Sequence, residues 1–207
     1  MRYVSQANRG KPFESLIRFA NDRYRMKRVA VIDKQYVEML PIRDKKGKIV
    51  SCKIGEKSTV DFLGRVLHVP IAIEAKETND KSIRFDRIEP HQADYMDEFT
   101  EEPGTIGLVL VSFGQKRYFA IPWAVWSAAY NARVRPGASK SAPATVTAFG
   151  TTWDIPKKAS VNMDEIPPEY EIPSHDTVYG FHYLKNAHKY ITPRKELQEV
   201  TVNGEKE

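Results

Sequence analysis

The 207-residue sequence contains one cysteine, Cys52, and no run of about 20 apolar residues. A single cysteine excludes an internal disulfide bond and a cysteine-rich zinc site. Without a long apolar run, the sequence offers no candidate for a membrane-spanning helix. The first six residues also lack the apolar core of a secretory signal peptide. We therefore expect a cytoplasmic protein with no membrane partner, because proteins of that compartment seldom rely on disulfide bonds.

Several common kinds of functional site are missing as well. No set of Ser, His and Asp residues suggests a nucleophilic hydrolase, and no glycine-rich segment is long enough to cradle a nucleotide phosphate. His175, His182 and His188 are seven and six residues apart, which does not suit two metal ligands on one helix face. Trp123 and Trp126 are expected in the core rather than on a surface that stacks against bases.

Basic residues are concentrated at the beginning of the chain. Residues 1–60 contain 15 Lys and Arg and 6 Asp and Glu, a net charge of +9. Residues 61–126 have a net charge of −4, and residues 127–207 are neutral overall. A basic surface beside an acidic one suggests a polyanion such as nucleic acid as the partner, although solvated lysines on a helix and a loop would give the same count.

The pattern of apolar residues predicts one domain over residues 1–190 and a flexible tail over 191–207. Residues 12–27 have apolar side chains at helical spacing, and the apolar run over 105–113 predicts a strand buried on both faces. The other expected elements are strands over 29–40, 59–64 (ending at a turn at Gly64), 66–76 and 118–121, helices over 89–99, 122–130 and 176–190, a flexible loop over 136–147 and an irregular segment over 154–175. Their order predicts an α/β fold with a mixed β-sheet flanked by helices.

Residues 41–58 have the composition of a protruding basic loop or β-arm, with Asp44-Lys45-Lys46-Gly47 as the tip of a hairpin. Basic side chains on such an arm suit contact with DNA phosphates; they are Arg43, Lys45, Lys46, Lys48, Lys53 and Lys57. Arg9 and Lys11, before the first helix, are further candidates for DNA contact. The apolar residues of the arm could instead form dimer contacts; they are Ile42, Ile49, Val50 and Ile54.

Two carboxylates and a lysine form the most informative group. Glu74 and Lys76 are two residues apart on an expected strand, so their side chains point to the same face. Asp61 lies on the preceding strand, and a turn at Gly64 and Arg65 can bring it beside Glu74. Two carboxylates there suit Mg²⁺ or Mn²⁺, and a lysine beside them can activate water or stabilise charge on a phosphate. The same residues would also fit an ordinary alternation of charges on an edge strand.

Three polar residues could add to this group. Glu14, on the first helix, is a candidate metal or water ligand, or else a solvated glutamate that favours the helix dipole. Gln92 could orient Lys76 or a phosphate, or form a surface pair with Tyr95, three residues further on. The Thr59 hydroxyl could donate to a phosphate or a carboxylate, or simply reflect strand propensity.

An ordered set of motifs resembles the RecU family of Holliday junction resolvases, which belongs to the restriction-endonuclease-like nucleases. The resemblance covers roughly residues 5–126. It is carried by Asn8-Arg9-Gly10, Glu14, Asn21, Tyr24, Ala30-Val31-Ile32-x-Lys34, Ser58-Thr59-x-Asp61, Gly64, Glu74-Ala75-Lys76-Glu77-Thr78 and His91-Gln92. Relative to this family, residues 132–155 are expected to be an insertion.

The resemblance implies a role for each of these candidates. Asp61 and Glu74 match the family's metal ligands, and Lys76 matches its catalytic lysine. Glu14 matches an acid that assists the metal or water, Thr59 a hydroxyl beside the site, and Gln92 an active-site glutamine. Residues 41–58 match a stalk that enters the centre of the junction.

The implied function is resolution of four-way DNA junctions in recombination and repair. A homodimer with two symmetric sites would cut opposing strands with Mg²⁺ or Mn²⁺. The family also implies a recombinase or a branch-migration helicase as possible partners. Two alternatives stay open: a related phage or repair nuclease acting on flaps, single strands or linear DNA, and a junction-binding protein without activity.

Overall fold

A computed structural model describes residues 11–55, 58–138, 142–173 and 175–192. Its helices are α1 (Lys11–Met26), α2 (Pro90–Glu101) and α3 (Trp123–Arg133), with 3-10 turns η2 (Phe85–Arg87), η3 (Met163–Glu165), η4 (Pro168–Tyr170) and η5 (Ala187–Tyr190). Its strands are β1 (Ala30–Lys34), β2 (Met39–Arg43), β3 (Ile49–Ile54), β4 (Phe62–Val66), β5 (Val69–Thr78), β6 (Ser82–Arg84), β7 (Ile106–Phe113), β8 (Arg117–Pro122), β9 (Ala144–Ala148), β10 (Thr151–Ile155), β11 (Ser160–Asn162) and β12 (Glu171–Ile172). Within these residues, no helix combines the length and apolar character needed to cross a membrane.

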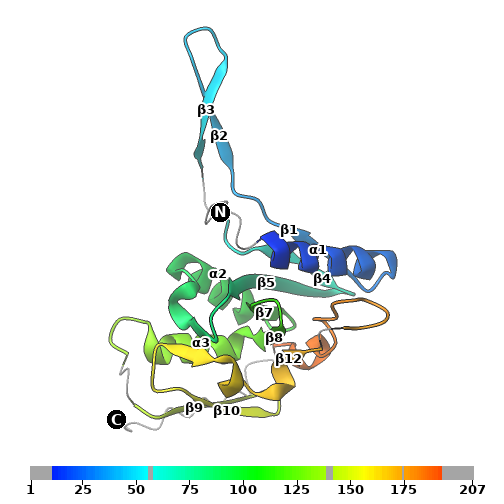
Figure 1. The fold of residues 1–207 in the computed structure, drawn as a ribbon, viewed down its shortest axis with the longest axis vertical. Coiled ribbons are helices and arrows are strands. Elements are labelled where there is room, and N and C mark those ends of the chain that lie inside the picture. The colour runs from blue at the N-terminus through cyan, green and yellow to red at the C-terminus, as the bar shows by residue number, and fades with distance from the viewer. Residues whose placement is uncertain (1–10, 56–57, 139–141, 174, 193–207) are drawn as a thin grey trace, which may run out of the picture.

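The centre of the molecule is a six-stranded sheet in the order β1-β4-β5-β7-β8-β12. β5 and β7 run parallel, and the other neighbours run antiparallel, so the sheet is mixed. α1 covers one face, and α2 and α3 cover the other (Figure 1). All eight residues of β7 are buried, as expected for a strand covered on both faces. The predicted α/β fold, a mixed sheet flanked by helices, is confirmed.

α1 forms over the predicted residues because its apolar side chains recur once per helical turn. Phe13, Ile17, Ala20 and Tyr24 are buried against the sheet. Glu14 lies in the first turn, at the edge of this apolar stripe. The helix therefore brings a carboxylate to the end of the sheet where β1 ends.

The expected turn at Gly64 is wrong. Gly64 lies inside β4, and the hairpin turns at Leu67 and His68, because Val66 pairs with Val69. A side chain at Gly64 would place its Cβ atom 2.1 Å from the main-chain oxygen of Val31. Glycine is needed here for the close approach of β1 and β4, not for a turn.

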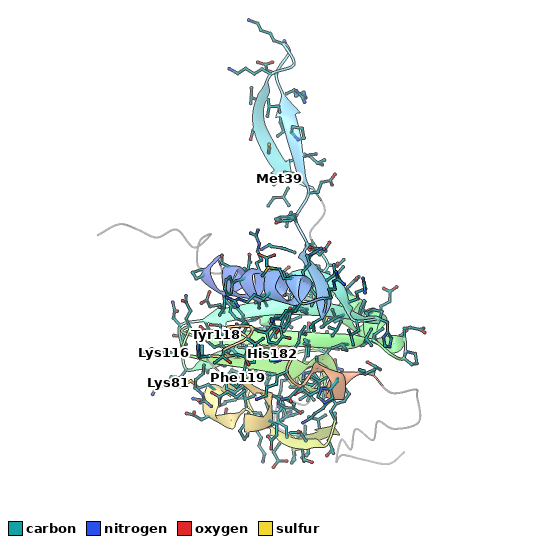
Figure 2. All side chains as sticks on the ribbon, turned by 90° about the vertical axis from the view of Figure 1, so that its right-hand side faces the viewer. Met39, Lys81, Lys116, Tyr118, Phe119 and His182 are labelled. Atoms are coloured by element: carbon teal, nitrogen blue, oxygen red, sulfur yellow. The ribbon has the colours of Figure 1, made fainter. Side chains whose placement is uncertain are left out.

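The chain leaves the sheet after β1 and forms a separate two-stranded arm, β2 and β3 (Figure 1). The single strand expected over 29–40 is therefore wrong, because residues 35–38 lie outside any strand. Every residue of β2 and β3 is exposed, and Figure 2 shows Met39 on the arm, outside the body of the molecule. At the tip, Asp44 Oδ1 accepts from the amides of Lys46 and Lys48 at 2.8 and 3.0 Å. The protruding β-arm is confirmed, and it begins at Met39 rather than at residue 41.

The C-terminal third differs more from expectation. The loop expected over 136–147 ends at Ala144, where β9 begins a hairpin with β10. No helix spans 176–190; η5 alone is helical there. Asp176 Oδ1 accepts from the amides of Val178 and Tyr179, and Gly180 has a φ of +74°. These local bonds form a turn that competes with helix formation.

Candidate active site

Asp61 and Glu74 meet at the end of the β4–β5 hairpin that lies towards the arm. Phe62 pairs with Ile73, so Asp61, one residue before β4, lies opposite Glu74 on β5. The amide of Ala75 donates to Asp61 Oδ2 at 2.8 Å, which fixes this carboxylate against the neighbouring strand. The predicted proximity of the two carboxylates is present, although the turn that produces it differs from the predicted one.

Glu74 is the most buried ionisable group in this region. It has no exposed surface, and its Oε2 atom has no hydrogen-bond partner among the described residues. Burial raises the pKa of Glu74 to about 7; repulsion by Asp61 adds to the rise, and Lys76 opposes it. A buried carboxylate oxygen without a partner beside a second carboxylate fits a site for a cation.

Lys76 and Gln92 hold the other oxygen of Glu74. Lys76 Nζ lies 2.6 Å from Glu74 Oε1, and Gln92 Nε2 donates to the same oxygen at 2.8 Å. Lys76 Nζ also donates to Gln92 Oε1 at 3.2 Å. The three side chains therefore form a closed set of hydrogen bonds, and the orienting role of Gln92 stays a prediction.

The position of Gln92 follows from the start of α2. Glu89 is the N-cap residue, Pro90 follows it, and Gln92 Oε1 accepts from the amide of Glu89 at 3.0 Å. This is a capping box, in which the third helical residue bonds back to the N-cap amide. The helix terminus thus fixes the side chain that bonds to Glu74 and Lys76.

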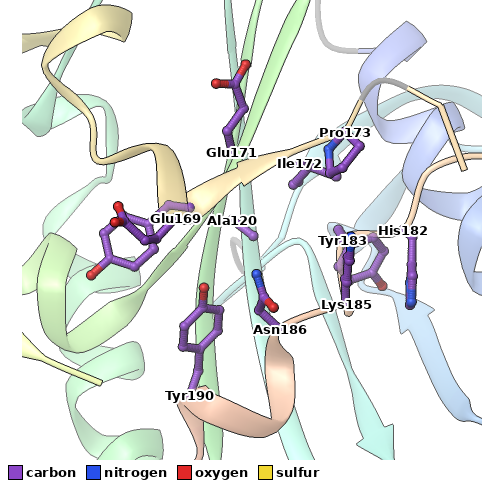
Figure 3. Close-up of a pocket in the computed structure, with 11 residues that line it drawn as sticks. Ala120, Glu169, Glu171, Ile172, Pro173, His182, Tyr183, Lys185, Asn186 and Tyr190 are labelled. Atoms are coloured by element: carbon purple, nitrogen blue, oxygen red, sulfur yellow. The ribbon is translucent and has the colours of Figure 1, made fainter. Parts of the chain in front are cut away.

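These residues line an open pocket of about 530 Å³. The lining residues are Glu14, Asp61, Glu74, Ala75, Lys76, Glu77, Thr78, Asn79, Asp80, Arg87 and Gln92. A second cavity, of about 20 Å³, lies between β12, Tyr183 and Tyr190 (Figure 3). It has room for about one water molecule, so it is far smaller than the pocket at Glu74.

Glu14 reaches the pocket from α1, but it is already paired. Its carboxylate forms an ion pair with Lys34 at the end of β1. Thr59 is exposed and is not among the described residues that line the pocket. The roles predicted for Glu14 and Thr59 stay predictions.

The predicted DNA-binding residues on the arm are far more exposed than the residues that line the pocket. Arg43, Lys45, Lys46, Lys48 and Lys53 are all exposed. Arg9 and Lys57 lie outside the described residues, as does the side chain of Lys11. Their contacts with DNA stay predictions.

Sequence reasoning gave no role to Glu77 and Arg87, which line the pocket, or to Lys34, which pairs with a lining residue. Lys34 pairs with Glu14, and Arg87 lines the pocket. Burial raises the pKa of the Glu77 carboxyl, Gln115 opposes the rise and the charge of Glu14 adds to it. Glu77 belongs to the motif Glu74-Ala75-Lys76-Glu77-Thr78, but no local signal in the sequence marks Arg87.

Two carboxylates, Asp61 and Glu74, are the protein groups best placed to hold a metal. In the part of the chain that the structure describes, no group of three or more His, Cys, Asp or Glu is arranged for this purpose. Mg²⁺ is commonly held by one or two carboxylates, with water and phosphate as the remaining ligands. The donor set and the unpartnered Glu74 Oε2 therefore fit such an ion.

Comparison with known proteins identifies the family. The family model described as Recombination protein U, RecU, matches residues 8–163. The chain belongs to the RecU family. The resemblance inferred from the motifs is confirmed, and Glu14, Asp61, Glu74, Lys76 and Gln92 all lie within the matched residues.

Individual RecU relatives match a shorter part of the chain. Proteins named Holliday junction resolvase RecU from Streptococcus pneumoniae strains Taiwan19F-14 and Hungary19A-6 are each 31% identical to it over 122 residues. The match covers 56% of this chain and spans 62% of the length of these relatives. The solved structure of Archaeoglobus fulgidus Hjc, a Holliday junction resolvase, has a TM-score of 0.36 at 10% identity, covering 74% of this chain and 88% of that one.

Proposed function

We propose that this RecU-family chain is a metal-dependent endonuclease that resolves four-way DNA junctions. The observation that carries the proposal is the buried, unpartnered Glu74 Oε2, opposite Asp61 and beside a lysine held at 2.6 Å from Oε1. Two carboxylates and a lysine that line an open pocket suit hydrolysis of a phosphodiester. Membership of the RecU family makes a DNA junction the favoured substrate.

Asp61 and Glu74 would hold Mg²⁺ or Mn²⁺. Such an ion supplies a Lewis acid that polarises a phosphoryl oxygen. Asp61 is positioned for this by the Ala75 amide, and Glu74 by Lys76 and Gln92. Ligands that are held in place before the ion binds lose little freedom on binding it.

Lys76 has an ammonium group with three N–H donors. Two are used by Glu74 and Gln92, which leaves the third for the attacking water or a phosphate oxygen. A fixed positive charge at this point stabilises the negative charge that develops on the phosphate during attack. The Glu14 carboxylate would assist by binding the metal or the attacking water, and the Thr59 hydroxyl would donate a hydrogen bond to the DNA.

The arm would enter the junction, with its basic residues next to the phosphates. Residues 39–54 contain five basic residues and one acidic residue. Arg43 and Lys53 lie on the exposed strands, and the other charged residues lie in the exposed turn between them. A four-way junction has two-fold symmetry, so two copies of the chain would bind as a homodimer and cut opposing strands. A recombinase or a branch-migration helicase is the expected kind of partner protein.

The test is cleavage of a labelled four-way junction beside a matched duplex and a flap, with Mg²⁺, with Mn²⁺ and with EDTA. Cleavage of the junction alone, abolished by EDTA, would support the proposal. Cleavage of flap or linear DNA would indicate a nuclease with a different substrate. Tight junction binding without cleavage under any condition would indicate a binding protein.

A further inference from the structure

Arg87 lies at the same pocket as the residues of the proposed active site. Its Nη2 atom donates to the main-chain oxygen of Glu77 at 3.4 Å. Glu77 follows Lys76 directly on β5, so the guanidinium lies beside the strand end that carries the proposed catalytic lysine. No catalytic role described above uses this side chain.

The main chain of Arg87 is held firmly although its side chain is exposed. Arg87 ends η2, in which Phe85 is fully buried and packs edge-on against Trp126 and Trp153, with ring centroids 5.4 and 6.2 Å apart. Ile88, the next residue, is also fully buried. An arginine between two anchored residues can present its guanidinium to the pocket from a fixed starting point.

No ion pair of Arg87 is found among the described residues, although the pKa of the neighbouring Asp86 is lowered by its hydrogen bond and ion pair with Arg84 and, to a lesser degree, by the charge of Arg87. Lys76, by contrast, is paired with Glu74. The hydrogen bond to Glu77 uses one of five guanidinium N–H donors and ends on a neutral carbonyl oxygen. Acidic residues otherwise dominate the pocket lining; they are Glu14, Asp61, Glu74, Glu77 and Asp80. Among the described lining residues, Arg87 is therefore a cation outside any ion pair, with four guanidinium N–H donors left for an anion.

We propose that Arg87 binds a phosphate of the cleaved DNA strand next to the scissile one. This inference rests on the proposed function, because it takes the DNA strand through the pocket past Lys76. A planar guanidinium binds a phosphate through two parallel N–H···O bonds, which fixes the orientation of the strand as well as its position. Arg87 is thus a positioning residue that holds the substrate, while Lys76 acts at the reacting phosphate.

Arg84 provides a matched control three residues earlier in the chain. It is also exposed, but its Nε donates to both oxygens of Asp86 at 2.9 and 3.1 Å. It does not line the pocket. Changing Arg84 or Arg87 to glutamine removes one positive charge in each case, so a difference between the variants reports a local contact.

The test measures binding of a labelled four-way junction in EDTA over a range of salt concentrations. Arg87→Gln should weaken binding about tenfold, the effect of losing a charge-assisted hydrogen bond. The slope of log K against log salt should fall by about 1, as for loss of one phosphate contact. Arg84→Gln should keep the wild-type slope, and Arg87→Lys should regain the slope with part of the affinity. With Mg²⁺, Arg87→Gln should raise KM and leave kcat near wild type.

An unchanged salt slope in Arg87→Gln, equal losses in both glutamine variants, or a fall in kcat at wild-type binding would each overturn the assignment. Thermal melting establishes whether each variant is folded. If Arg87→Gln is not folded, the readout is the partial loss of junction affinity expected for Arg87→Lys, and wild-type affinity of that variant would overturn the assignment. A wild-type protein that neither binds nor cuts DNA would instead contradict the proposed function.

Discussion

Lys76 is the residue on which the proposed chemistry depends most. Lys76→Ala should lower kcat for junction cleavage by about 10²–10³, the usual effect of removing one group that stabilises transition-state charge. Junction binding should change much less, because the exposed cations of the arm would provide most of the phosphate contacts. Single-turnover cleavage and gel-shift binding measure the two effects separately.

Lys189→Ala is the control, since Lys189 is exposed in η5 and does not line the pocket. It should cut at the wild-type rate. A Lys76→Ala protein that cuts as fast as wild type would remove this lysine from the mechanism.

Glu74 predicts how the stability of the metal-free protein depends on pH. Its pKa is about 7 in the folded chain against an ordinary 4.5, so the folded state binds this proton more tightly than the unfolded state. The contribution of this proton to the free energy of unfolding is fully present below about pH 4.5 and is lost as the pH rises to about 7. Glu74→Gln removes the buried charge and should be more stable than wild type above pH 7, by roughly 3 kcal/mol. Urea unfolding in EDTA at several pH values measures this difference.

The same pair of proteins tests the metal site without any cleavage assay. A divalent cation binds the ionised carboxylate, so Mg²⁺ or Mn²⁺ should raise the melting temperature of wild type and hardly that of Glu74→Gln. In the urea experiment, equal free energies of unfolding for the two proteins in EDTA near pH 8 would show that the charge of Glu74 does not destabilise the folded protein.

At the scale of secondary-structure elements, the start of α2 couples a helix cap to the candidate active site. Gln92→Ala removes the capping-box bond to Glu89 and the bonds to Glu74 and Lys76. We expect a loss of about 1 kcal/mol in stability from the cap and a fall of about 10- to 100-fold in cleavage, as for other groups that orient metal ligands.

Gln92→Glu separates the two effects. It keeps an oxygen for the Glu89 amide, but it places a third negative charge beside Glu74 and Asp61. It should retain the cap while cleavage stays low. Chemical denaturation and cleavage rates of both variants check this, and wild-type cleavage by Gln92→Ala would contradict the orienting role.

The arm should matter for the junction and hardly at all for folding. All residues of β2 and β3 are exposed, so replacing residues 40–53 by an Asn-Gly turn between the paired Met39 and Ile54 removes no buried contact. The free energy of unfolding should change by less than about 1 kcal/mol. Junction affinity should fall sharply, and affinity for a short duplex should fall much less.

A triple variant, Lys45→Gln, Lys46→Gln and Lys48→Gln, keeps the arm and removes three charges from its tip. It should reduce the salt slope of junction binding by about 3 at most. Equal losses of junction and duplex affinity in the arm deletion would contradict entry of the arm into the junction centre.

Elements of the core were predictable because burial imposes a period on the sequence. The helix over α1 and the strand over β7 follow from apolar residues at helical spacing and from a continuous apolar run. The predictions of a turn at Gly64 and of a helix over 176–190 were wrong for different reasons, the first long-range and the second local. Gly64 is required by contact with Val31, a residue distant in sequence, and the Asp176 side chain competes for amides that a helix would use.

At the scale of the whole molecule, the candidate site could be predicted in part. Asp61, Glu74 and Lys76 come together because adjacent strands of one hairpin carry them, and alternation along a strand is readable from sequence. The pairing of Glu14 with Lys34 depends on how α1 packs on β1, and the place of Arg87 depends on the anchoring of η2. Such contacts between separate elements leave no pattern in a single sequence.

The arm and the pocket are also chemically different. The arm presents basic side chains to solvent, while the pocket at the end of β5 collects carboxylates. The basic beginning of the chain and the acidic middle therefore correspond to separate surfaces. A DNA junction would meet the basic arm first, and its strands would then reach the carboxylates together with a divalent cation.

The most direct measurement maps the cut positions on all four strands of a labelled junction, with wild type and Asp61→Asn side by side in Mg²⁺. The proposed function predicts paired cuts at symmetric positions on two opposing strands by wild type. It predicts junction binding without cuts by Asp61→Asn. Asp33→Asn, which changes an exposed carboxylate on β1 paired with Arg25, should cut like wild type. Cuts by Asp61→Asn at the wild-type rate, or no cuts by wild type with any divalent cation, would contradict the assignment of a junction-resolving site to this pocket.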